Sequence, residues 1–201
     1  MTAQAIQGIK QLLATPEPPE LGPQPRANVQ SAAALNAKLD SLFREARFPL
    51  QQQQLIRSLV LLWHDQLDAA HTIALSIENP DGSFVHAIMH RREPDYFNAK
   101  YWWRRVGAHP AFPEIARRVE ELLTGSRRRE EADPGDIGKV RLLTSAATNA
   151  DFSKRLVPAG KWDASAFVDL CEGAKADSVI QTLREVQRVE TEVLLDFICH
   201  E

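Results

Sequence analysis

The feature that most constrains the fold is a stripe of apolar residues in the second quarter of the chain. Its members follow one another at steps of three and four residues: Ile56, Leu59, Trp63, Leu67, Ala70, Ala74 and Ile77. This spacing places them on one face of an α-helix, and a face of that length must be covered by other helices. We therefore expect one long helix from about Pro49 to Ile77, ended by the turn residues Pro80 and Gly82.

Helical spacing recurs in residues 28–46 and 178–199, whereas strand patterns are nearly absent. The sequence therefore predicts an all-α fold, a single-domain bundle of about six to eight helices. Residues 1–15 form a short amphipathic arm, residues 16–27 a proline-rich linker, and residues 28–201 the helical domain. The arm is expected to dock either on its own domain or on another subunit of a homo-oligomer, and residues 126–138 are expected to form a surface loop.

Charge and composition exclude several classes of protein. Twenty-four basic against 27 acidic residues give a net charge of −3, so nothing global attracts nucleic acid or an anionic membrane. The N-terminus lacks the pattern of a secretion signal, and no apolar run is long enough to span a bilayer. Cys171 and Cys199 lie in apolar helical patterns typical of reduced, buried thiols. We therefore expect a cytoplasmic protein.

Five of the six histidines fall between Trp63 and Phe112. His86 and His90 are four residues apart, so they share one face of a helix. The turn before them is short, which predicts that this helix lies beside the long one. His86 and His90, with His64 as a third ligand, are then candidates to bind a divalent transition metal such as zinc, with His71 or Asp68 as alternatives to His64. The alternative is that these imidazoles bond to the protein itself.

A carboxylate among these histidines suggests acid–base chemistry. On the predicted long helix, Asp68 lies about one turn from both His64 and His71, where it can orient an imidazole. Glu190 falls inside the apolar stripe of the last helix, and a buried carboxylate needs a partner. We expect that partner to be a histidine or arginine of residues 64–105, the alternative being a salt bridge at the end of the bundle. The candidate catalytic residues are His64, Asp68, His71 and Glu190.

Basic and aromatic residues alternate in "MHRREPDYFNAKYWWRRVGAH", which Asp95 can cap as a helix. Guanidinium groups bind phosphate or carboxylate, and aromatic rings stack on flat ligands. The candidate residues for binding an anionic small molecule are Arg91, Arg92, Lys100, Trp103, Arg104 and Arg105. In the alternative interpretation these arginines are structural and are paired with Glu93 and Asp95. Nucleic acid is a less favoured ligand because the net charge is negative.

The block "WHDQLDAAH" followed by "HAIMHRREPDYFNAKYWWRRVGAHP" resembles the signature of a family of soluble bacterial and fungal proteins without an assigned activity. The resemblance implies a recurring module and carries over no catalytic residues. Three functions remain open. In the first, the chain binds an anionic small molecule in a His/Arg/aromatic pocket, and it hydrolyses that molecule if it is an enzyme. In the second, it is a non-catalytic interaction module with a closed polar core network. In the third, it is a metal-dependent hydrolase.

Overall fold

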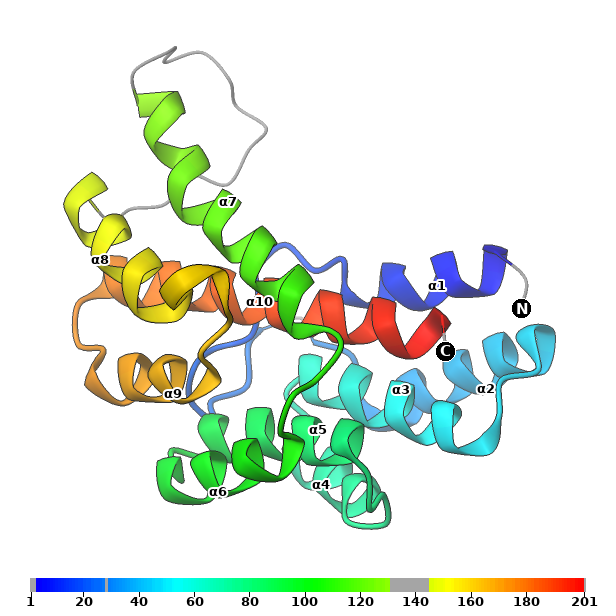
Figure 1. Ribbon diagram of the computed structural model, residues 1–201. Helices are drawn as coiled ribbons and strands as arrows, with labels where there is room; N and C mark the ends of the chain where they lie inside the picture. The colour runs from blue at the N-terminus through cyan, green and yellow to red at the C-terminus, as the bar shows by residue number, and fades with distance from the viewer. Residues whose placement is uncertain (1–2, 28, 131–144, 201) are drawn as a thin grey trace.

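The computed structural model describes residues 3–27, 29–130 and 145–200, and within them the side chains of all residues except 126–130 and 146. The regular secondary structure of the described residues is helix alone, without strands, which confirms the predicted all-α fold class (Figure 1). The helices are α1 (Ala3–Leu13), α2 (Ala32–Ala46), α3 (Leu50–Trp63), α4 (Leu67–Ala74), α5 (Pro80–Arg92), α6 (Tyr96–Val106), α7 (Phe112–Glu130), α8 (Ala146–Leu156), the short 3-10 helix η1 (Pro158–Gly160), α9 (Ala164–Gly173) and α10 (Asp177–His200).

These ten α-helices of the described residues exceed the expected six to eight. The prediction treated α3 and α4 as one helix and missed α8, whose surroundings in the sequence have no clear apolar period. The predicted surface loop over 126–138 is also wrong at its start, because α7 continues to Glu130. The rest of that loop lies outside the described residues. No helix in the described part of the chain is long and apolar enough to cross a membrane.

The last helix organises the bundle. α10 runs across the middle of the molecule and contacts α1, α3, α7 and α9 (Figure 1). Its buried apolar residues include Leu183, Val186, Val193 and Leu194, the stripe expected from their helical spacing. Helices α4, α5 and α6 form a group on one side of this axis, and α5 packs on α3, α4 and α6.

The N-terminal arm docks on its own chain. α1 buries Ala5, Ile9, Leu12 and Leu13 and lies beside α2 and α10 (Figure 1). Residues 16–27, which were predicted as a linker, contain no helix, but Pro18 and Pro19 are buried. The segment is therefore fixed to the body of the molecule.

The long helix predicted from Pro49 to Ile77 is broken in two. α3 ends at Trp63, and Asp65 adopts a left-handed backbone conformation with φ of 62° before α4 begins at Leu67. Neither glycine nor proline marks the break, so the sequence period continues through it. The cause is tertiary: the Asp65 carboxylate accepts hydrogen bonds from Arg26 and from Arg92.

The start of α5 matters for the candidate site. Asn79 caps this helix by accepting a hydrogen bond from the Gly82 amide at 2.8 Å, and Pro80 is its first residue. Asp95 caps α6 as expected, through a 3.2 Å hydrogen bond from the Asn98 amide. The two caps fix where α5 and α6 begin, and α5 packs on both α4 and α6.

Candidate functional site

Three histidines come together where α4 packs against α5. The ring centroid of His71, on α4, lies 5.4 Å from that of His86 and 5.6 Å from that of His90. His86 and His90 follow each other on α5 with centroids 6.2 Å apart. We call His71, His86 and His90 the histidine cluster. The sequence predicted that the faces of the two helices would meet, and these three residues do so.

His86 is at the buried end of the cluster. Its side chain is 1% exposed and its ring stacks on Trp102 of α6, with centroids 4.1 Å apart and planes 9° apart. Its Nδ1 lies 3.2 Å from the Gly82 carbonyl oxygen, which can only accept a hydrogen bond, so the proton is on Nδ1. The lone pair is then on Nε2, a buried atom without a hydrogen-bond partner among the described residues. Burial lowers the pKa of His86 to about 4, so the ring is neutral near pH 7.

His90 adds nearby acidic groups. Its Nδ1 is 3.4 Å from Glu93 Oε2 and 3.8 Å from Asp95 Oδ2. Neither contact has the geometry of a hydrogen bond, so Nδ1 has no hydrogen-bond partner among the described residues. Burial lowers the pKa of His90 despite the opposing effect of these two carboxylates. The suggested pairing of Glu93 and Asp95 with Arg91 and Arg92 is not what the structure shows, since the carboxylates face this imidazole.

His64 does not join the cluster, contrary to the predicted metal set of His64, His86 and His90. Its Nε2 donates to the Leu12 carbonyl oxygen at 2.8 Å, and its Nδ1 accepts from the Gln30 amide at 3.3 Å. Both nitrogens are therefore occupied, and burial lowers the pKa of this imidazole. Because the helix breaks just after His64, the predicted flank of His64, Asp68 and His71 on one helix is not formed. Asp68 is exposed on α4.

Glu190 pairs with Arg91 in the centre of the molecule, as the position of this carboxylate in the apolar stripe predicted. Both side chains are fully buried, and Arg91 donates from Nη1 to Oε1 at 3.2 Å and from Nη2 to Oε2 at 2.6 Å. The guanidinium also donates to Gln187 at 3.3 Å and lies 4.2 Å from the ring centroid of Phe167. Burial acts to lower the pKa of Arg91, but the Glu190 carboxylate acts in the opposite direction. The pKa of Arg91 is on balance raised, and the arginine remains charged. This pair has no open face on which to bind a ligand.

Arg92 belongs to a second closed network. It donates to Asp65 Oδ1 at 2.6 Å and to the Leu62 carbonyl oxygen at 2.5 Å, at the C-terminal end of α3. Arg26 donates to Asp65 through its backbone amide and Nε at 2.9 and 3.0 Å, and to the Trp63 carbonyl oxygen. Burial acts to raise the pKa of Asp65, but the hydrogen bonds from Arg26 and the charge of Arg92 outweigh it and lower the pKa. Two arginines thus cap α3, where a cation is favourable.

The proline-rich segment is held by buried donors from α10. Arg184 donates to the carbonyl oxygens of Pro18 and Pro19 at 2.5 and 3.3 Å, and Gln187 donates to that of Pro19 at 3.1 Å. Proline supplies carbonyl oxygens but no N–H group, so an extended proline-rich chain needs donors from elsewhere if it is buried. Arg26, Asp65 and Arg184 were missed from the sequence, because their partners are distant and no local pattern marks them.

The remaining candidates for anion binding lie on or beside α6, and they divide into two groups. Lys100 is paired with Asp169 of α9, and Trp103 is buried against Phe84 with centroids 4.6 Å apart. Arg104 and Arg105, in contrast, are exposed. Of the six predicted anion-binding residues, only these two present an open, unpaired guanidinium within the described part of the chain.

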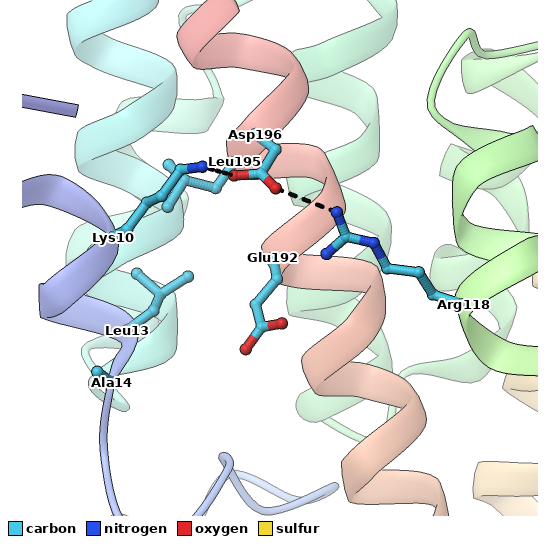
Figure 2. A pocket seen from close by; sticks show the side chains of 7 residues that line it. All are labelled: Lys10, Leu13, Ala14, Arg118, Glu192, Leu195 and Asp196. Atoms are coloured by element: carbon cyan, nitrogen blue, oxygen red, sulfur yellow. Dashed lines mark hydrogen bonds and ion pairs between the residues drawn. The ribbon is translucent and has the colours of Figure 1, made fainter. Parts of the chain in front are cut away.

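Two pockets stand out among the described residues, and neither is lined by a residue predicted for the site. The first, of about 170 Å³, lies between α1, α7 and α10 (Figure 2). Asp196 bridges Lys10 and Arg118 at 2.7 and 3.4 Å along one side of it, and Figure 2 shows the Glu192 carboxylate apart from that bridge. The second, of about 250 Å³, is lined by residues that include Glu20, Gln24 and Tyr96. The predicted pocket of histidines and arginines is therefore not one of these cavities.

Comparison of the chain with known protein families, curated proteins and solved structures finds no relative. No family model matches the chain, and neither the curated proteins nor the solved structures contain a match.

Proposed function

We propose that the protein is a binding module that captures an acidic, partly apolar segment of a partner protein on the outer face of α6. The observation that carries the proposal is the exposure of two aromatic side chains on that helix: Phe97 is 78% and Tyr101 is 42% exposed. They are four residues apart and so share one face of the helix. Arg104 continues that face one turn further on, and Arg105 flanks it.

The composition of this face is that of an interface centre. Aromatic residues and arginine are enriched where binding energy concentrates in protein interfaces. Burying one Phe side chain is worth about 1.5–3 kcal/mol, so leaving Phe97 in water is costly unless a partner covers it. The Arg105 guanidinium already lies over Tyr101 and Trp102, 5.9 and 5.4 Å from their ring centroids. This preformed arrangement reduces the entropy lost on binding.

Charge selects the partner. Arg104 and Arg105 make no ion pair among the described residues, and the neighbouring Lys100 is neutralised by Asp169. The face is therefore basic on a protein of net charge −3, and a partner with carboxylates beside apolar side chains complements it. The outer side of a helix is convex, which suits a peptide segment better than a small molecule. The closed networks of Arg91 and Arg92 are consistent with a module whose core holds its shape and does no chemistry.

The test is a fluorescence anisotropy titration with three labelled probes: a peptide of alternating Glu and Leu, the same peptide with Lys in place of Glu, and a single-stranded oligothymidylate. We expect the acidic peptide to bind and to weaken as salt is added. Phe97→Ala and Arg104→Glu should each weaken it by about tenfold, the equivalent of about 1.4 kcal/mol.

Two control variants match these changes on other surfaces. Leu50→Ala removes another exposed apolar side chain, 71% exposed on α3, and Lys161→Glu reverses an exposed charge outside α6; both should bind like the wild type. Equal binding of the acidic and basic peptides, or unchanged binding by Phe97→Ala, would refute the proposal. Preference for the oligothymidylate would replace it with single-strand binding.

A further inference from the structure

The histidine cluster is a feature that the α6 face does not explain. In most ring contacts of the described residues, at least one of the two rings belongs to Phe, Tyr or Trp. Here three imidazoles from two helices lie within 5.4–6.2 Å of one another. Imidazole brings a nitrogen lone pair to such a cluster, which an apolar ring does not.

The lone pair of His86 is buried and unused. Gly82 holds the proton on Nδ1, and Nε2 has no hydrogen-bond partner among the described residues. A buried acceptor without a donor costs about 1–3 kcal/mol and needs an explanation. Histidines that bind metal ions characteristically donate the other ring N–H to a backbone carbonyl oxygen, which fixes the tautomer that leaves the coordinating nitrogen free. His86 has this arrangement.

The charges around the cluster favour a cation. Glu93 and Asp95 lie 3.4 and 3.8 Å from His90, and neither carboxylate has an arginine or lysine partner among the described residues. Neutral imidazole beside carboxylate is the donor set of zinc and related transition metals.

We propose that His71, His86 and His90 form a binding site for a divalent transition metal ion of the zinc class, with Glu93 as the fourth ligand. In the arrangement that the structure shows, no group of three or more His, Cys, Asp or Glu side chains among the described residues could hold a metal ion. Binding therefore requires a ring to turn. His71 is the side chain that can do so, because it is half-buried on an eight-residue helix and no hydrogen bond holds its ring within the described structure.

The experiment titrates purified full-length protein with Co²⁺, read by its visible absorption, and with Zn²⁺, read by calorimetry. One equivalent of each ion should bind the wild type, and Zn²⁺ should displace Co²⁺. His71→Ala and His90→Ala should each weaken binding by at least about tenfold, since even changes behind a ligand cost that much. His200→Ala, which removes an exposed histidine, should bind both ions like the wild type.

If a variant does not fold, the measurement on the wild-type protein still decides the question. Nitrogen NMR of the histidine rings should show one Zn²⁺ equivalent shifting the Nε2 signal of His86 while that of His64 stays in place. Absence of saturable binding, or equal binding by the wild type and His71→Ala, would overturn the proposal and leave the cluster as packing against Trp102. Either outcome is independent of the α6 face, whose test uses peptides in metal-free buffer.

Discussion

Removing one member of the Arg91–Glu190 pair should destabilise the protein more than removing both. Both side chains are fully buried and joined by two hydrogen bonds, at 3.2 and 2.6 Å. Arg91→Met leaves a carboxylate in the core without a cation, and Glu190→Leu leaves a guanidinium without an anion. Breaking a buried pair in this way costs about 3–5 kcal/mol. For a protein of this size, that corresponds to a fall in melting temperature of roughly 6–20 °C.

The double variant Arg91→Met/Glu190→Leu should be more stable than either single variant. An apolar pair of similar volume is often neutral or better than the ion pair it replaces. One cost remains, because Gln187 loses the hydrogen bond that it accepts from Arg91 at 3.3 Å. An unsatisfied buried acceptor costs about 1–3 kcal/mol, so the double variant should fall within about 3 kcal/mol of the wild type.

Urea denaturation followed by tryptophan fluorescence and far-UV circular dichroism gives the four free energies of unfolding for the cycle. The matched control is Arg117→Met on α7, which removes an arginine paired with Glu114 and Glu121 at the surface; its midpoint should not change measurably. The reasoning fails if either single variant costs less than about 1 kcal/mol, or if the losses of the two single variants simply add in the double variant.

Three further predictions test other parts of the described structure. The folded-state pKa of His64 lies below its ordinary value of 6.5, so the unfolded chain takes up this proton first; its contribution to stability is complete above pH 6.5 and falls below it by up to about 1.4 kcal/mol per pH unit. Denaturation of His64→Gln at pH 7 and pH 5 should show a smaller loss than the wild type. Gly82→Ala should cost about 1–3 kcal/mol by overpacking, because its Cβ would lie 2.3 Å from the Ile77 carbonyl oxygen; a melting curve equal to the wild type's would contradict this. Asp65→Asn keeps a residue that tolerates the left-handed backbone but removes the charge facing two buried arginines, so it should lower the free energy of unfolding by about 3–5 kcal/mol.

Local patterns predicted much of the fold. Apolar spacing identified most of the helices, and the position of Glu190 in an apolar stripe predicted its pairing with the 64–105 segment. The break between α3 and α4 escaped prediction because it depends on Arg26, 39 residues from Asp65. No sequence period records a contact of that kind.

The candidate site was predictable only in part. The short turn between α4 and α5 was enough to bring His71 towards His86 and His90. Nothing in the spacing revealed that His64 bonds to Leu12, which is 52 residues away. The same limit applies to the arginines, since Arg91 and Arg104 share a sequence block and differ only in which side of their helix the rest of the chain covers.

The attachment of the proline-rich segment to α10 has a consequence for biosynthesis. Gln187 and Arg184 hold Pro19 across 168 and 165 residues of chain, so the Pro19 carbonyl oxygen lacks these two donors until α10 has been synthesised. Contacts of residues 12–22 with α3 and α5 can form earlier, whereas the attachment to α10 is the last of them to become available.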